Sequence, residues 1–143
     1  MRLNMRTQYA LRALIGIAMN SGDESVKVRE LAWRENIPVK FLEQVMVILK
    51  NAGFVLSRRG RNGGYVLARP SCDIMLGDLI RQMEGSGSAV ANLKDSTMPT
   101  GLREVMEEVD QATNYLLDSF SLAEICRRSR QSHPQHKRNV VCV

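Results

Sequence analysis

The chain has 143 residues, 44% of them hydrophobic, with 3 cysteines and a formal net charge of +5. No apolar run approaches the ~18 residues that cross a bilayer, and polar residues interrupt the apolar ones near the start, which excludes a membrane protein and a secretory signal. The cysteines are odd in number and far apart, which excludes a disulfide framework. We therefore expect a small cytoplasmic protein with one domain, or one domain and an appendage.

Two helices are predicted in the first 35 residues. The first runs from Met5 to Asn20, because apolar residues recur there at helical spacing and Asn4 is a favourable N-cap. A turn follows at residues 21–23. An extended stretch at residues 26–28 then leads to a brief helix over residues 29–35.

A third helix is predicted from Pro38 to about Ala52, since proline is well tolerated at the first helical position. Its apolar residues follow the i, i+3, i+4, i+7 spacing of one buried face, which contains Leu42, Val45, Met46, Leu49 and Ala52. The first two turns present Val39, Lys40, Glu43 and Gln44 outward.

A β-hairpin is predicted next, with strands over residues 54–59 and 65–69. Asn62-Gly63 between them is a strong turn signal, because both residues tolerate positive φ. Three arginines lie at or beside the tip, namely Arg58, Arg59 and Arg61.

The second half of the chain is predicted to be helical. A short helix covers residues 76–84, and a flexible loop rich in Gly, Ser and Thr follows over residues 85–100. A long amphipathic helix then runs from Leu102 to Asp118. Ser121 caps a last short helix that ends at Arg127, and residues 128–143 form a basic tail that we expect to be disordered.

The succession of helix, short helix, helix and hairpin is that of a winged helix-turn-helix. We therefore predict a mainly α protein with a small β-hairpin wing, in which this domain precedes the long helix. Residues 1–70 carry 12 Lys and Arg against 5 Asp and Glu, which suits a polyanionic partner.

Double-stranded DNA is the partner that this layout favours. The third helix offers polar side chains to base edges in a major groove, where Gln44 pairs with adenine, Glu43 accepts from cytosine and Lys40 reaches guanine or phosphate. The wing residues Arg58, Arg59 and Arg61 suit a narrow minor groove. The alternative is that these groups form an ordinary solvated helix face and a charged guard on a strand edge.

A family resemblance is carried by five segments. They are Met1-Arg2-Leu3, Tyr9-Ala10-Leu11-Arg12-Ala13-Leu14, Phe41-Leu42-Glu43-Gln44, the wing from Arg59 to Pro70, and Gly77-Asp78-Leu79-Ile80. In these segments the chain resembles the winged-helix regulators that include IscR, NsrR and CymR.

The resemblance implies a transcriptional regulator, expected to be a repressor, that binds a palindromic operator as a homodimer. The implied domains are a DNA-binding domain over residues 1–84, the loop 85–100, and a dimerisation helix with a short C-terminal helix over residues 101–127, before the tail 128–143. The implied dimer interface contains Leu102, Val105, Met106, Val109 and Leu116.

One departure from the family concerns iron. Many of these regulators hold an iron–sulfur cluster on three cysteines of the loop before the dimerisation helix. Residues 85–101 of this chain contain neither Cys nor His, so we expect no cluster and no other cofactor. His133, His136 and Cys142 in the tail are not expected to form a metal site.

The signal that the protein senses stays open. Cys72 and Cys126 are candidate redox switches, because neighbouring arginines favour a reactive thiolate, although isolated cysteines are more often packing residues. The alternative is a regulatory protein or small-molecule effector, with the acidic residues 71–119 as a docking surface. No catalytic constellation is present, so we expect no enzymatic activity.

Overall fold

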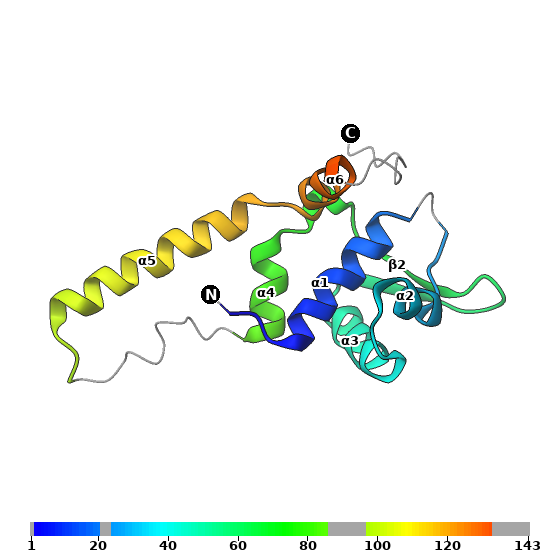
Figure 1. Cartoon of the computed structure of the whole chain (residues 1–143), viewed down its shortest axis with the longest axis horizontal. Helices are drawn as coiled ribbons and strands as arrows, with labels where there is room; N and C mark the ends of the chain where they lie inside the picture. Colours follow the sequence, from blue (N-terminus) through cyan, green and yellow to red (C-terminus); the bar gives the residue numbers. More distant parts are fainter. Residues whose placement is uncertain (1, 21–23, 86–96, 133–143) are drawn as a thin grey trace.

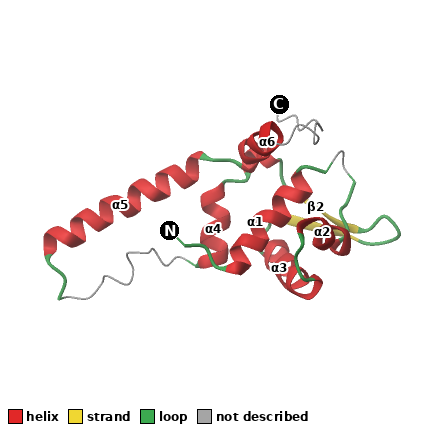
Figure 2. Ribbon diagram, viewed as in Figure 1, coloured by secondary structure: helices red, strands yellow, loops and turns green. Residues whose placement is uncertain are grey.

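The computed structural model describes residues 2–20, 24–85 and 97–132, and within these the chain is mainly helical (Figures 1 and 2). The elements in chain order are α1 (Met5–Ala18), α2 (Val28–Glu35), α3 (Val39–Asn51), β1 (Val55–Arg58), β2 (Gly64–Leu67), the 3₁₀ helix η1 (Ser71–Asp73), α4 (Leu76–Glu84), α5 (Thr100–Ser119) and α6 (Leu122–Ser132). This confirms the predicted fold class, a winged helix-turn-helix with a long additional helix.

Helix α1 lies at the centre of the domain and contacts α2, α3, α4, α6 and β2. Its N-cap is Asn4, as predicted, whose side chain accepts a hydrogen bond from the Thr7 amide. The buried face of α1 is rich in small residues, which let neighbouring helices approach closely. A Cβ at Gly16 would lie 2.6 Å from Leu31 Cδ1 of α2.

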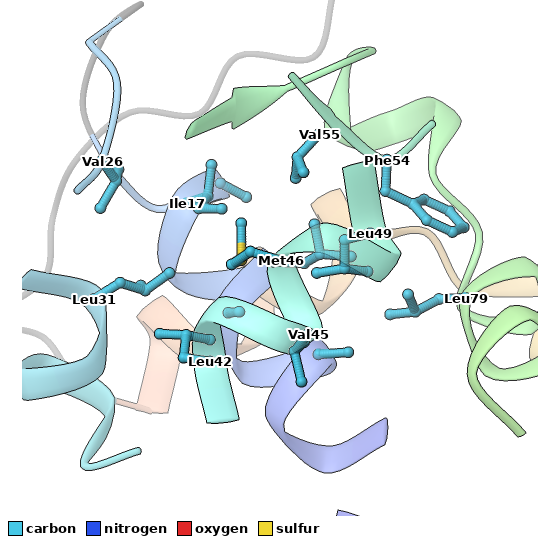
Figure 3. Close-up of a cluster of buried hydrophobic side chains, with 14 of the residues drawn as sticks. Ile17, Val26, Leu31, Leu42, Val45, Met46, Leu49, Phe54, Val55 and Leu79 are labelled. Carbon is cyan, nitrogen blue, oxygen red and sulfur yellow. The ribbon is translucent and has the colours of Figure 1, made fainter. Parts of the chain in front are cut away.

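The hydrophobic core is formed where α1, α2, α3 and the sheet meet (Figure 3). Helix α3 contributes four of the five residues that its periodicity predicts, which are Leu42, Val45, Met46 and Leu49, all at most 2% exposed. The fifth, Ala52, is the C-cap of α3 and is only half-buried. The turn from α2 to α3 is set by Asn36, which ends α2 in the left-handed conformation at φ 52°. This turn fixes which face of α3 points away from the core.

The two strands pair in an antiparallel register from Val55 opposite Leu67 to Arg58 opposite Gly64. The predicted turn at Asn62-Gly63 is wrong in its detail. Positive φ occurs instead at Gly60 and Gly64, and the Gly63 amide donates to the Gly60 carbonyl at 2.9 Å. The turn is therefore centred one residue earlier, on Arg61 and Asn62. We call β1, β2 and residues 59–63 the wing.

Helix α4 occupies its predicted bounds and joins two parts of the molecule. At the C-terminal end of α4, the Glu84 carboxylate accepts hydrogen bonds from the backbone amide of Asn4 at 2.9 Å and from the buried Thr7 hydroxyl at 2.5 Å, both at the start of α1. Earlier in α4, Arg81 donates to Asp118 of α5 at 2.5 Å and to Asp78 at 3.0 Å. Hydrogen bonding to Asp118, then to Asp78, raises the pKa of Arg81.

Helix α5 has no buried residue and projects away from the rest of the fold (Figure 1). Helix α6 returns to the domain, where Leu122 and Cys126 are at most 3% exposed and complete the core. The Ser121 hydroxyl accepts from the Glu124 amide at 3.2 Å, which confirms the predicted cap.

The strands, α3 and α5 each begin or end one or two residues away from their expected bounds, and three further boundaries differ in a way that affects the interpretation. Helix α1 ends at Ala18, and Val28 begins α2 instead of lying in an extended stretch. Helix α6 continues to Ser132, so residues 128–132 are helical and not part of an irregular tail. Ion pairs support this extension, because Arg127 and then Arg128 bond the Glu124 carboxylate and lower its pKa to about 2.

Some expectations concern residues outside those described, namely the turn at 21–23, most of the loop 85–100 and residues 133–143. Among the described helices, none combines the length and apolar character needed to span a bilayer.

We predict that Gly77→Ala loosens the joint between α4 and α5. The new Cβ would lie 2.0 Å from Asp118 Oδ1 and 3.0 Å from the Arg81 guanidinium, so the ion pair must move apart. Because the Arg81–Asp118 pair is exposed, its loss should lower the free energy of local unfolding at this joint by about 1 kcal/mol. This corresponds to roughly fivefold faster amide exchange in the last turns of α5. Hydrogen exchange followed by mass spectrometry measures this.

The matched control is Gly101→Ala at the start of α5, where an added Cβ meets nothing within 4 Å. This variant gains helix propensity without touching the joint. Equal exchange in the last turns of α5 for the two variants would show that the Arg81–Asp118 contact does not hold the helix.

Candidate nucleic-acid interface

The polar face of α3 points away from the core. Lys40, Glu43 and Gln44 are all exposed, while the opposite side of the helix, which carries Leu42, Val45, Met46 and Leu49, is buried. This exposure follows from the helical period, since residues three and four apart share a face. The helix therefore offers a cationic, an anionic and an amide side chain along about one turn, and their role in reading bases stays a prediction.

The start of α1 lies beside this face of α3, which sequence reasoning missed. Gln44 lines an open depression of about 410 Å³ together with the α3 residues Phe41 and Val45 and the α1-side residues Asn4, Met5, Arg6 and Tyr9. Phe41 is 58% exposed and meets Tyr9 edge to ring at a centroid distance of 6.4 Å. No local signal reveals this, because it depends on how α1 packs against α3.

The wing projects at the end of the molecule opposite α5 (Figure 1), and its residues Arg58, Arg59 and Arg61 are exposed. Within the described part of the chain, neither Arg59, Arg61 nor Lys40 forms an ion pair with a carboxylate. Uncompensated cations on an exposed hairpin attract a polyanion such as DNA.

The segment before α2 anchors the wing. Val26 and Tyr65 exchange backbone hydrogen bonds of 2.9 and 2.8 Å, and the Ser25 hydroxyl donates to the Asn62 carbonyl. Gly64 permits this contact, because a Cβ there would lie 2.5 Å from the Val26 carbonyl oxygen. The glycine also has φ +149°, a conformation that side-chain-bearing residues rarely adopt. The position of the arginines thus depends on a glycine.

The apolar stripe predicted on α5 is largely open to solvent. Leu102, Val105, Val109 and Leu116 are 44 to 57% exposed, while Met106 is half-buried. The main contact of α5 is with α4, at the C-terminal end of α5, and this contact leaves the stripe available to a partner.

The two described cysteines differ in access. Cys72 is half-buried in η1, directly after the wing, whereas Cys126 of α6 is 0% exposed. Elements η1 and α6 pack against each other. Oxidants therefore have better access to Cys72, and the third cysteine, Cys142, lies outside the described residues.

Comparison with known proteins gives a consistent result. The family model described as "Rrf2: Iron-dependent Transcriptional regulator" matches residues 3–128. The protein rrf2 of Nitratidesulfovibrio vulgaris is 31% identical over 132 residues, covering 89% of this chain and 88% of the relative. CymR of Bacillus subtilis is 34% identical over 125 residues, covering 87% and 89%.

Solved structures agree. The structure of CymR, the global cysteine regulator of B. subtilis, has a TM-score of 0.80 at 32% identity and covers 90% of this chain and 98% of its own. The structure of T. potens IscR has a TM-score of 0.78 at 30% identity, with 93% and 91% covered. Staphylococcus aureus CymR in its oxidized form has a TM-score of 0.74 at 28% identity, with 88% and 96% covered.

The donor atoms of the described residues do not fit an iron–sulfur cluster, although the family description mentions iron. Clusters are held mainly by thiolates. The segment before α5 supplies none, and the described thiols are one half-buried and one fully buried side chain. Within the described residues, no three His, Cys, Asp or Glu side chains are grouped to bind a metal.

We predict that Gly64→Ala displaces the wing and lowers affinity for DNA at least tenfold. The added Cβ collides with the Val26 backbone, which cannot move as a flexible side chain does, so the Val26–Tyr65 pairing is lost. Backbone strain at positive φ adds about 1–2 kcal/mol of destabilisation. Thermal unfolding and fluorescence anisotropy with labelled duplex DNA measure the two effects.

The control variant Gly53→Ala separates the effect of backbone strain from the effect of the collision with Val26. Gly53 also has positive φ, but a Cβ there has no neighbour within 4 Å. This control should lose only the stability that backbone strain costs, which is less than Gly64→Ala loses, and should keep its DNA affinity. If both variants bind DNA equally well, the wing does not need its contact with Val26.

Proposed function

The chain belongs to the Rrf2 family of transcriptional regulators, and on this premise we propose that it is a homodimeric repressor whose α3 helices read a palindromic operator. It is a DNA-binding transcriptional regulator and not an enzyme, as its relatives are regulators. Its proposed place of action is the cytoplasm.

The polar face of α3 is the observation that carries the proposal. Lys40, Glu43 and Gln44 are exposed on a helix whose other side is firmly held in the core, so the face is presented rigidly. A major groove admits such a helix. Gln44 would form a bidentate pair with adenine, Glu43 would accept from the cytosine amino group, and Lys40 would bind guanine or phosphate.

The wing supplies the second contact. Arg59 and Arg61 have exposed cationic heads and no carboxylate partner in the described residues, and they are flanked by glycines that let the backbone approach DNA. Arginine is favoured in narrow minor grooves because the negative potential is enhanced there. Arg58, at the end of β1, would add a phosphate contact.

Helix α5 supports the homodimer. Its 20 residues extend about 30 Å, and none of them is buried. The exposed stripe of Leu102, Val105, Val109 and Leu116 is long enough to pair with a second α5, with Met106 at its margin. A two-fold dimer would place two α3 helices on half-sites about one DNA turn apart, or a multiple of it.

Two alternatives for the signal remain proposals. A docked regulatory protein or a small effector would act through the acidic middle segment, residues 71–119. Thiol oxidation would act at Cys72, which is more accessible than Cys126. An oxidized form of a related CymR supports considering the second alternative.

We predict that Gln44→Ala weakens operator binding by about 1–3 kcal/mol and relaxes the base preference at one position of each half-site. The operator is first obtained by selection from a random duplex pool, and affinities are then measured by anisotropy. The affinity should also fall steeply with salt, because DNA binding releases condensed counterions.

The matched control is Gln111→Ala, the same change at an exposed position of α5. It should leave both affinity and preference intact. Unchanged preference in Gln44→Ala would remove that residue from base reading, and the absence of any selected sequence would overturn the proposed function.

We predict that Val109→Glu converts the dimer to a monomer without unfolding the domain. The substitution places a charge in the middle of the proposed apolar interface, where burial without a partner is costly. Because Val109 is 51% exposed in the single chain, the melting of the monomeric fold should change little. Sedimentation equilibrium measures the assembly state.

Gln111→Glu introduces the same charge two residues away, on the opposite side of α5, and should remain dimeric. A dimeric Val109→Glu protein would place the interface elsewhere.

A further inference from the structure

One apolar residue interrupts the polar face of α3. Val47 is 52% exposed, although the other side of this helix carries Val45, Met46 and Leu49 into the core. It is not among the partly buried side chains that pack against the core in the described residues. The fold therefore leaves Val47 without a packing role.

Helical geometry places Val47 in line with the proposed base-reading residues. Positions separated by three and four residues share a face, so Lys40, Gln44, Val47 and Asn51 form one stripe, which we call the reading stripe. All four residues are exposed. DNA-reading helices of homeodomains likewise use positions spread over two turns.

Spacing along the helix separates Val47 from Gln44 by about one base-pair step. Three residues at 1.5 Å each give about 4.5 Å, compared with about 3.4 Å between successive base pairs. A side chain at Val47 therefore meets the neighbour of the base pair that Gln44 contacts.

The chemistry of valine selects one kind of base edge. In the major groove, guanine, adenine and cytosine offer hydrogen-bonding groups, which valine cannot satisfy, whereas thymine also offers its C5 methyl group. Valine is β-branched and holds one strongly preferred rotamer in a helix, so its two methyl groups are already oriented.

We propose that Val47 is a specificity-determining residue, an inference that rests on the proposed function. Its side chain contacts the C5 methyl group of a thymine in each half-site, next to the base pair read by Gln44. Lys40 and Gln44 then supply polar contacts, and Val47 supplies the apolar one.

Deoxyuridine tests this, because it lacks only the methyl group of thymine. The thymines of the selected operator are replaced one position at a time in both half-sites, and affinities are measured for the full-length protein. Wild type should lose roughly fourfold in affinity per lost methyl contact at one position, next to the base whose preference Gln44→Ala relaxes. Val47→Ala retains only the Cβ of the side chain, so it should distinguish the thymine and uracil duplexes less than wild type does, and it should melt no lower than wild type.

Val39→Ala is the matched control. Val39 lies on the same helix and is 37% exposed, but it is off the reading stripe. This variant should keep the preference of wild type for thymine. Equal sensitivity of wild type and Val47→Ala to every uracil replacement would overturn the methyl contact while leaving the operator function intact. Absence of any sequence preference in wild type would overturn both.

Discussion

The small buried side chains of α1 are the constraint on which the rest of the structure depends. Ala10 and Ala13 are fully buried, and Gly16 has no room for a Cβ beside Leu31. Close approach on this face lets one helix of 14 residues contact α2, α3, α4, α6 and β2 together. Close packing in such a core resists deformation. The orientation of the reading helix α3 therefore depends on its packing against α1, in addition to the turn at Asn36 and its own buried face.

A different kind of interaction connects this rigid domain to α5. Glu84 binds the start of α1, where the Thr7 hydroxyl is buried, and this end of α4 is well held. Arg81 and Asp118, in contrast, pair through side chains that are 38% and 47% exposed. Exposed pairs contribute little stability. The softer joint thus lies between α4 and α5, so a signal that alters the spacing of two DNA-binding domains would require least energy there.

Local chemistry accounts for what the sequence could predict. Periodicity predicts α4 at its observed bounds and the buried face of α3, and capping preferences identify Asn4 and Ser121. Contacts between distant segments have no such signal. The turn rule for Asn62-Gly63 fails because docking of Gly64 on Val26 decides where positive φ is needed. Likewise, the proximity of α1 to the reading face arises from packing that no short pattern records. The extension of α6 is different, because the pairs of Glu124 with Arg127 and Arg128 have the i, i+3 and i, i+4 spacing that a sequence does show.

The distribution of charge gives the proposed α5-paired dimer and its proposed complex with DNA opposite responses to salt. Residues 71–119 carry 9 acidic against 3 basic residues, and α5 contains the exposed residues Glu104, Glu107 and Glu108. Pairing two such helices brings like charges together, and salt screens this repulsion while leaving the apolar contact intact. Binding to DNA weakens with salt, because the release of condensed counterions into a more concentrated salt solution is less favourable. Loss of operator binding at high salt would therefore come from the DNA contacts, since the same salt favours the dimer.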